Sequence, residues 1–320
     1  MKILTEIVLR TLLCASAALP LSLHAQAYPS RPITIVVPYG PGSGNDMIAR
    51  EVAQQLTQIM KTTVLVENKA GATGNIATNY VAQAKPDGYT IFLTSTSSII
   101  NQVTNPAVKT DLSKDFESIA FAASLPYVVA VPPGFAAKSL SDVVKLAKAS
   151  PGKLNYNGPS GSVSDYLGTK LKASNNLDMV MIPYKSTSDA QVDVLAGRIQ
   201  VWFTTAASAV GLAKGEKIRV IAVTGDKRLA ALPDVPTVKE AGIPDMFTEV
   251  SFFFVAPAGT PKEIIEKLSK SIDLALQSKD VENRLANMSV QVKKGLPMEV
   301  NNHIKAEMAK WSKNANAIAK

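Results

Sequence analysis

Short apolar runs rich in β-branched residues alternate with segments of helical spacing along almost the whole chain after residue 27. The runs that read as strands are 33–37, 63–66, 89–93, 153–156, 179–182, 200–203 and 219–223. Between them, apolar residues recur every three to four positions, for example in 46–60, 139–149, 165–173 and 189–196. Strands that alternate with helices predict an α/β fold whose parallel sheets are covered on both faces.

Two longer extended segments, 118–131 and 249–256, interrupt this alternation. They suit two crossings between lobes, with residues 28–125 plus 250–320 in lobe 1 and 126–249 in lobe 2. A chain that crosses and returns in this way places its ligand in a cleft between the lobes. Thr260-Pro261-Lys262-Glu263 reads as a capping box that opens an amphipathic helix of the returning segment.

The N-terminus has the pattern of a secretory signal peptide. Lys2 and Arg10 precede an apolar run, 11–23, and the small-residue triplet 25–27 follows it. We therefore expect cleavage before Tyr28 and a periplasmic protein. A lipoprotein signal at Cys14 or a retained membrane anchor are the alternatives, but Leu13 is large for a lipobox and the apolar run is shorter than a membrane span.

Removal of 27 residues from the 320 leaves 293, with a net charge of +7 in place of +8 and no cysteine. Stability must then come from a large hydrophobic core rather than from disulfides. The positive charge attracts anionic solutes. Because no basic run is interleaved with aromatic residues, nucleic acid is not expected as a partner.

A glycine-rich loop, VVPYGPGSGNDMIAR (36–50), lies between the first expected strand and the first expected helix. The free N–H groups and the dipole of a helix N-terminus bind anions. Asn45 and Asp46 after Gly44 match neither a Walker loop nor the dinucleotide fingerprint, so a small carboxylate fits better. A turn in which Asn45 or Asp46 only caps the helix is the alternative. The candidate ligand-binding residues here are Tyr39, Gly40, Gly42, Ser43, Gly44, Asn45 and Asp46.

A second small, hydroxyl-rich loop, NGPSGSVSDYLG (157–168), leads into a helix of the other expected lobe. Two such loops facing across a cleft would hold a ligand from both sides. Its candidate residues are Ser160, Gly161, Ser162, Ser164 and Asp165. Asn75 and the segment Ser95, Thr96 and Ser97 are weaker candidates, since open α/β sheets bind ligands at the carboxyl ends of strands.

The segments YPSRPITIVVPYGPGSGND, ENKAGATGNIA, KPDGYTIFLTS, IPYK, LPDVPTVKEAGIP and APAGTP occur in order along the chain. Together they resemble the extracytoplasmic solute-binding proteins of the tripartite tricarboxylate transporter family, often called Bug proteins. The resemblance implies a type II, Venus-flytrap periplasmic-binding-protein fold, closure on a small carboxylate and delivery to a two-component membrane permease. It also implies that the loops matching 39–46 and 157–165 hold the carboxylate, partly through water.

The sequence departs from the family pattern at several positions. Ser43 and Asn45 replace a glycine and a threonine, and Thr204 and Thr205 stand where many members have an acidic residue soon after a strand. Without that carboxylate an ammonium group lacks a partner, so we expect amino acids to bind poorly. Thr204 and the Tyr184 of IPYK complete the candidate site. Ser251 and Phe253 replace a tryptophan and a glycine, which either reshapes the cleft or repacks the core.

The sequence offers little for catalysis. After residue 27 the chain has one histidine, His303, which reads as a solvated helix residue, and no Gly-x-Ser-x-Gly elbow. Metal-binding clusters are also lacking, so we expect no enzyme activity, cofactor or metal. The expected partners are a dicarboxylate, tricarboxylate or aromatic acid and the permease subunits, bound by a monomer. The alternative is a protein that presents its ligand to a membrane sensor kinase; a neighbouring gene pair for permease subunits would favour transport.

Overall fold

A computed structural model of the chain describes residues 28–158, 161–184 and 187–318. By its internal contacts the chain divides into an N-terminal unit, 1–30, and a large unit, 31–320. The architecture below is that of the large unit. The predicted signal peptide and Ser160 lie outside the described residues.

The strands and helices alternate through most of the chain, as the periodicity predicts. The strands are β1 (Ile33–Val37), β2 (Val64–Asn68), β3 (Thr90–Ser95), β4 (Phe116–Val131), β5 (Asn155–Asn157), β6 (Val180–Ile182), β7 (Trp202–Thr205), β8 (Arg219–Val223), β9 (Glu249–Pro257) and β10 (Gln291–Val292). The helices are α2 (Gly44–Met60), α3 (Asn75–Ala82), α4 (Thr96–Thr104), α5 (Leu140–Ala149), α6 (Val163–Asn175), α7 (Thr187–Leu195), α8 (Ala206–Lys214), α9 (Lys262–Leu276), α10 (Lys279–Asn287) and α11 (Pro297–Ile318). Every strand predicted from the sequence is present, with ends shifted by two residues or fewer.

Among the described residues, eight strands form one sheet in which the path β10-β4-β9-β3-β1-β2 is joined by β7 and β8, both paired with β4. β5 and β6 form a separate parallel pair. The prediction of parallel sheets is only partly right. β1 is parallel to β2 and β3, but β9 is antiparallel to β3 and β4, and β7 and β8 are antiparallel to β4. Strand direction depends on where the chain returns to the sheet, which the periodicity of a single strand does not encode.

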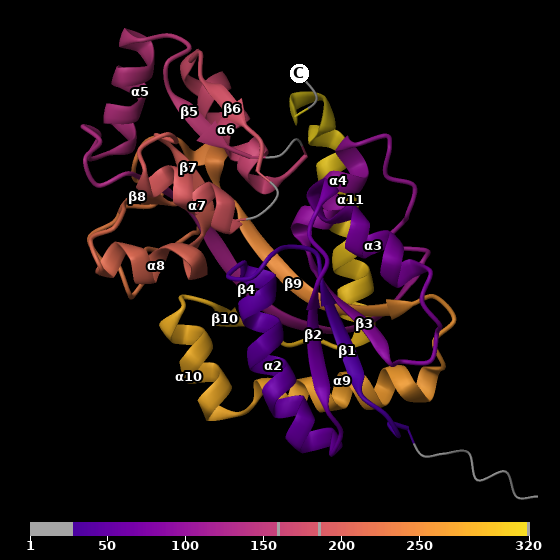
Figure 1. The fold of residues 1–320 in the computed structure, drawn as a ribbon. Coiled ribbons are helices and arrows are strands. Elements are labelled where there is room, and N and C mark those ends of the chain that lie inside the picture. The colour runs from indigo at the N-terminus through magenta and orange to yellow at the C-terminus, as the bar shows by residue number, and fades with distance from the viewer. Residues whose placement is uncertain (1–27, 159–160, 185–186, 319–320) are drawn as a thin grey trace, which may run out of the picture. The chain divides into compact units, whose positions relative to one another are not determined.

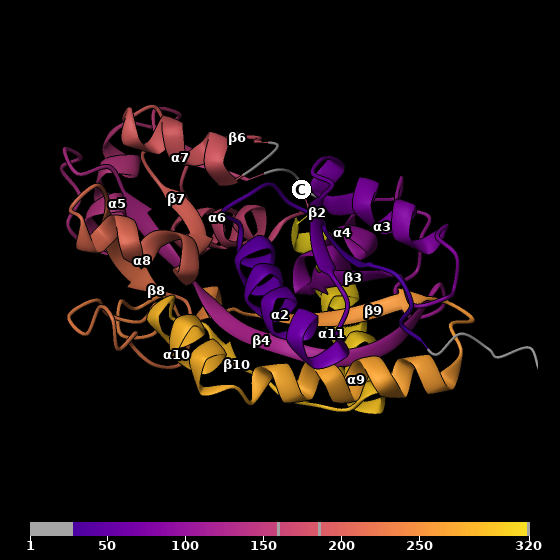
Figure 2. The ribbon, with the colours of Figure 1, turned by 60° about the horizontal axis from the view of Figure 1, so that its bottom comes forward.

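The long strand β4 connects two groups of elements (Figure 1). Its residues 116–126 pair with β9, whereas Tyr127–Ala130 pair with β7 and the end of the strand continues along β8. Helices α5 to α8 gather around β5 to β8, and the other helices gather around β1, β2, β3 and β9 (Figures 1 and 2). This is the two-lobed α/β fold predicted from the sequence. The lobe boundaries near residues 125 and 250 stay predictions.

Amphipathic helices cover the sheet with apolar faces. In α2, Ile48, Val52 and Leu56 are fully buried, as their spacing predicts, but Ile59 is 36% exposed and Met60 is buried in its place. α11 packs on α4 and β4, and α9 packs on α2 and β4. A second cluster around the buried Trp202 forms the core beneath β7 and β8.

Two local predictions in the C-terminal third are wrong. The capping box is not formed: Thr260 Oγ1 donates to the Pro257 carbonyl at 2.7 Å, and α9 begins after Pro261 without a side-chain cap. His303 is not a solvated residue, because it is half-buried with its ring 5.2 Å from that of Phe121. Burial, aided by the charge of Lys293, lowers the pKa of His303 to about 4.

In the part of the chain that the structure describes, no helix combines the length and apolar character needed to cross a membrane.

Candidate functional site: a cavity between the lobes

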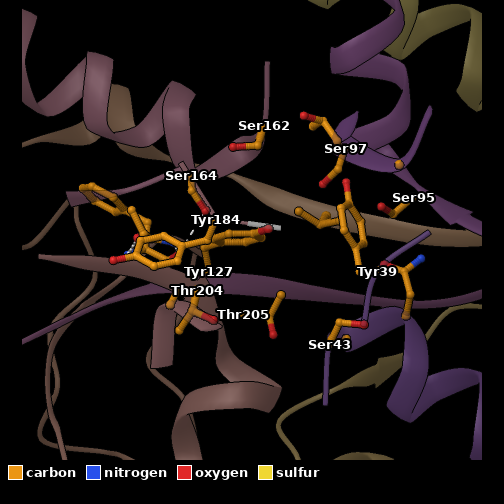
Figure 3. Close-up of a pocket in the computed structure, with 18 of the residues that line it drawn as sticks. Tyr39, Ser43, Ser95, Ser97, Tyr127, Ser162, Ser164, Tyr184, Thr204 and Thr205 are labelled. Carbon is orange, nitrogen blue, oxygen red and sulfur yellow. Dashed lines mark hydrogen bonds between the residues drawn. The ribbon is translucent and has the colours of Figure 1, made fainter. Parts of the chain in front are cut away.

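A cavity of about 350 Å³ opens where the two groups of elements meet. In Figure 3, Tyr39, Ser43, Ser95 and Ser97 face Ser162, Ser164, Tyr184, Thr204 and Thr205 across it. β4 contributes Tyr127 and β9 contributes Val250 and Phe252. The cavity is therefore built from loops of both lobes and from the two strands that run between them.

Five helices of the described chain begin at this cavity. The N-cap residues of α2, α3, α4, α6 and α8 all line it: Ser43, Gly74, Ser95, Ser162 and Thr205. The first N–H groups of a helix lack intrahelical acceptors, and the helix dipole places about half a positive charge there. Several such ends directed at one space make a strong site for an anion.

The first loop is held by a reciprocal cap. Ser43 Oγ accepts from the Asp46 N–H at 3.3 Å, and the Asp46 carboxylate accepts from the Gly42 N–H at 3.0 Å. Gly42 has a φ of +78°, which glycine adopts readily. Asp46 also accepts from Arg50 and Asn68, so its carboxylate serves the loop and does not line the cavity.

The second loop repeats this construction. Ser162 Oγ accepts from the Asp165 N–H at 3.1 Å, the Asp165 carboxylate accepts from the Gly161 N–H at 3.0 Å, and Gly161 has a φ of +75°. Both loops carry the pattern Gly-Ser-x-x-Asp, at 42–46 and at 161–165. The repeated pattern is the sequence signal that assigns both aspartates to the loops rather than to the ligand.

The third residue after each glycine, Asn45 or Ser164, anchors its helix to a neighbouring strand. Asn45 Nδ2 donates to the Leu93 carbonyl in β3 at 2.9 Å, and Ser164 Oγ donates to the Phe203 carbonyl in β7 at 3.0 Å. Both side chains line the cavity. The two helix ends are thus fixed to neighbouring strands in equivalent ways.

The two loop carboxylates differ in electrostatic environment. Burial alone would raise the pKa of Asp46, but the hydrogen bonds from Arg50, Asn68 and the Gly42 N–H outweigh it, so the pKa is lowered. Asp165 lacks an arginine, and burial raises its pKa despite the Gly161 N–H. The first loop is consequently held by a carboxylate that hydrogen bonds keep ionised. The second is held by a carboxylate whose ionised form is destabilised by burial.

Tyrosine hydroxyls stand at the centre of the cavity. The Tyr39 hydroxyl is buried without a hydrogen-bond partner among the described residues, and burial raises its pKa. Burial raises the pKa of Tyr127 to about 12, and the nearby hydroxyls of Ser97 and Ser164 offset part of that effect. Both phenols are therefore neutral near pH 7, and the Tyr39 hydroxyl, which lies near Ser97, can donate to a ligand oxygen.

Tyr184 is oriented from outside the cavity. Its hydroxyl donates to Asp193 Oδ2 at 2.6 Å, and Arg198 Nε donates to the other oxygen of Asp193 at 2.7 Å. Burial, followed by the Asp193 carboxylate, raises the pKa of Tyr184 to about 12. With its hydrogen committed to Asp193, Tyr184 offers its ring and an oxygen acceptor to the cavity.

The remaining wall is aromatic or small, with Phe203 and Phe252 beside the tyrosines. No Asp, Glu, Lys, Arg or His of the described chain lines the cavity. The described residues also contain no group of three or more His, Cys, Asp or Glu placed to hold a metal ion. Backbone N–H groups, hydroxyls and helix dipoles supply the polar contacts, and aromatic rings surround the body of a ligand.

The structure brings together about half of the residues predicted from the sequence. Those that line the cavity are Tyr39, Ser43, Gly44, Asn45, Ser95, Ser162, Ser164, Tyr184 and Thr204, with Ser97. Those that do not line it are Gly40, Gly42, Asp46, Asn75, Thr96, Gly161 and Asp165. Thr96 Oγ1 instead accepts from the Ser251 N–H in β9 at 3.1 Å. Ser160 lies outside the described residues.

Lining residues that were not among the individual candidates include Tyr127, Phe203, Thr205 and Phe252, and also Asn157, which begins the second predicted loop. Asn157 joins β5 to β7, since its Nδ2 donates to the Phe203 carbonyl at 3.0 Å and its Oδ1 accepts from the Phe203 N–H at 2.7 Å. Thr205 could have been found as an N-cap, because it is a hydroxyl residue before an alanine-rich helix. The strand residues carry no comparable local signal.

Several contacts among the described residues join the lobes directly. Ser208 Oγ in α8 donates to the Gly42 carbonyl at 3.1 Å, and the rings of Tyr166 in α6 and Trp311 in α11 meet edge to face at 4.7 Å. Gly161 approaches α4 so closely that an added Cβ would lie 2.7 Å from Thr104 Oγ1. These contacts surround the cavity and form only when the two lobes lie together.

The comparisons with known proteins agree with this architecture. The family model described as "Tripartite tricarboxylate transporter family receptor" matches residues 48–319. The "UPF0065 protein in tcbD-tcbE intergenic region" of Pseudomonas sp. (strain P51) is 33% identical over 291 residues, which is 90% of this chain and 86% of that protein. The chain belongs to the tripartite tricarboxylate transporter receptor family, as its motifs predict.

Solved structures of similar proteins share the two-lobed fold. The periplasmic binding protein BugD is 28% identical with a TM-score of 0.87, over 91% of this chain and 99% of that one. MatC from Rhodopseudomonas palustris, with bound malate, is 26% identical with a TM-score of 0.86, over 90% of this chain and 100% of that one. R. palustris Rpa4515, with adipate, is 29% identical with a TM-score of 0.86, over 91% of this chain and 98% of that one.

Proposed function

We propose that this protein binds a small carboxylate in the periplasm and delivers it to the membrane permease of a tripartite tricarboxylate transporter. The observation that carries the proposal is the convergence of five helix N-termini on a cavity that no charged side chain of the described residues lines. Such a cavity is positive through its dipoles and N–H groups, so it favours an anion over a cation or a neutral sugar.

The chemistry of the wall narrows the class of anion. Hydroxyl and N–H donors match carboxylate oxygens, and the aromatic rings match an apolar carbon skeleton. The similar proteins with bound malate and adipate support dicarboxylates as the first class to test. No carboxylate of the described chain lines the cavity to pair with an ammonium group, which supports the prediction that amino acids bind poorly.

Family membership supports delivery to a permease, and the likeness to the periplasmic binding protein BugD supports the periplasmic location. The expected role is that of a binding protein rather than an enzyme, which family membership supports; the described lining residues pair no serine or threonine with a histidine or carboxylate that could act as its general base.

The direct test is a thermal-shift screen of residues 28–320, unfolded and refolded to remove carried-over ligand, followed by calorimetric titration. The panel contains malate, adipate, citrate and benzoate, with aspartate, glutamate, glucose and AMP as the other classes. A ligand at a hundred times its Kd adds about 2.7 kcal/mol to the free energy of unfolding, which is a shift of several degrees in Tm. Stabilisation by AMP or glucose and not by carboxylates would contradict the proposal.

The chain offers a matched pair of variants for this test. Ser162 and Ser139 are both N-caps that accept from an aspartate N–H at 3.1 Å, and both aspartates accept from an N–H just before the cap. Ser162 lines the cavity and Ser139 does not. Each change to alanine should cost about 1 kcal/mol of stability. Ser162→Ala should also weaken carboxylate binding several-fold, whereas Ser139→Ala should leave it unchanged.

A further inference from the structure

Lys293 is a half-buried lysine on the face of the sheet that points away from the cavity. It follows β10, and its N–H donates to the Ala122 carbonyl of β4 at 3.2 Å. Its side chain crosses β4 with Nζ 4.0 Å from the centre of the Phe121 ring, and Nζ donates to Ser251 Oγ in β9 at 3.1 Å. The ammonium group is therefore fixed against the back of β9.

β9 is the wall between this ammonium group and the cavity. Val250 and Phe252 line the cavity. Side chains alternate along a strand, so Ser251, which lies between them, points to the opposite face. The Ser251 N–H donates to Thr96 Oγ1 at 3.1 Å, at the first residue of α4. The single strand β9 thus separates the ammonium group from the cavity. The same part of β9 contacts α4, whose N-terminus lies at the cavity.

The charge of Lys293 is poorly compensated where it lies. Among the described residues no carboxylate lies within ion-pair distance of Nζ, and burial lowers the pKa of Lys293 although Glu307 and Glu249 oppose the effect from farther away. His303 packs on the same Phe121 ring, and its buried Nε2 has no partner among the described residues. Lys310, also near His303, is held by Glu307 at 3.1 Å.

We propose that Lys293 supplies a counter-charge to the carboxylate in the cavity, acting through β9 without touching the ligand. This inference rests on the proposed function, since it requires an anion in the cavity. A partly buried cation without an ion-pair partner is costly, and an anion bound across the strand reduces that cost. By linkage the same coupling strengthens binding of the anion.

The size of the effect follows from the geometry. Side chains on the two faces of one strand point in opposite directions, so we take a separation of about 10 Å between the ammonium group and the ligand carboxylate. Two unit charges at that distance, with an effective dielectric constant of about 20, change affinity by on the order of tenfold. Glu249 and Glu307 offset part of this field. We expect Lys293 to contribute about three- to tenfold in affinity for a monoanion and more for a dianion.

The test replaces Lys293 and its exposed neighbour Lys294 separately. Lys293→Met keeps an apolar stem on Phe121 and removes the charge, Lys293→Arg keeps a charge, and Lys294→Met removes an exposed charge. The probes are malate, adipate, the monomethyl ester of adipate, and benzoate, titrated calorimetrically at low and at physiological salt. Unfolding is followed in parallel without any probe.

Lys293→Met should weaken binding of adipate about three- to tenfold and binding of its monomethyl ester less. It should not lower Tm, because the charge that has been removed is partly buried and poorly compensated. Lys293→Arg should retain most of the affinity, and Lys294→Met should change it less than about twofold, an effect that salt screens. Unchanged affinity in Lys293→Met, or a loss that is equal for both adipate forms and accompanied by a lower Tm, would overturn the inference. Failure of every probe to bind the unchanged protein would instead reject the proposed function.

Discussion

Gly161→Ala is expected to weaken ligand binding in addition to the folding cost that a left-handed glycine position imposes on alanine. Gly161 has a φ of +75° and belongs to the second loop, in the predicted lobe 2. A Cβ at this position would lie 2.7 Å from Thr104 Oγ1 and 3.4 Å from Asn101 Oδ1, both on α4 of the predicted lobe 1. Ordinary van der Waals contact starts at 3.4 Å, so the methyl group is about 0.7 Å too close to Thr104.

The two consequences have different sizes and different controls. The left-handed backbone conformation costs alanine about 1–2 kcal/mol of stability. Gly197→Ala carries the same cost without a neighbour, because Gly197 has a φ of +74° and nothing lies within 4 Å of its added Cβ. The contact with Thr104 exists only while the lobes are together, since it joins α4 to the second loop. It should therefore hold the N-terminus of α6 away from the ligand and reduce affinity by about tenfold or more, equivalent to about 1.4 kcal/mol.

The assay compares the two variants by thermal unfolding without ligand and by calorimetric titration with the best carboxylate from the screen. We expect equal losses of Tm, and a loss of affinity in Gly161→Ala alone. This expectation assumes that Gly161 also lies against α4 when the ligand is bound. If Gly161→Ala bound the carboxylate as tightly as Gly197→Ala does, that assumption would be wrong.

Three further changes test the packing around the site. His303 has a folded pKa of about 4, below its value of 6.5 in the unfolded chain, so the unfolded chain binds the proton first and stability falls as pH drops from about 6.5 to about 4. His303→Leu should remove about 1–2 kcal/mol of that loss, seen by comparing urea unfolding at pH 7 and 4.5; an identical pH dependence would contradict it. Asn157→Leu leaves the buried Phe203 N–H without a partner and should cost about 2–4 kcal/mol in urea unfolding; a cost below about 1 kcal/mol would mean that the bridge from β5 to β7 is dispensable. Gly168→Ala places a Cβ 2.1 Å from the Tyr156 ring and should lower the free energy of unfolding by about 3 kcal/mol or more. Circular dichroism recorded during thermal unfolding measures this loss, and an unchanged Tm would show that α6 adjusts freely.

The strands and most helices could be predicted because each reflects a local pattern of apolar residues. The run 33–37 and the run 219–223 match β1 and β8 without any shift. α4 was missed because it starts directly after β3, with three hydroxyl residues that read as a loop. α8 was missed for a related reason, since its alanine-rich sequence has weak amphipathic spacing.

Within the candidate site, the sequence located both loops but did not separate the residues that shape a loop from those that face the cavity. Asp46 and Asp165 have the chemistry of ligand contacts, yet each accepts the N–H of a preceding glycine and turns away. The prediction treated every hydrogen-bonding side chain of the loops as a ligand contact and did not consider that backbone N–H groups of the loops also need acceptors. The repeated Gly-Ser-x-x-Asp pattern answers that question.

The amino-acid sequence alone determines the α/β alternation and the family, because these depend on residue types and on their spacing along the chain. It also determines that segments 39–46 and 157–165 carry no charged residue apart from their aspartates. Strand direction, the approach of five helix ends to one cavity and the positions of Tyr127 and Phe252 arise in the folded molecule. The same holds for Lys293, which reaches Ser251 across 42 residues of chain. Contacts of this kind depend on how β4 and β9 pair, and pairing between distant segments is selected by the packing of the whole core rather than by the local sequence of either strand.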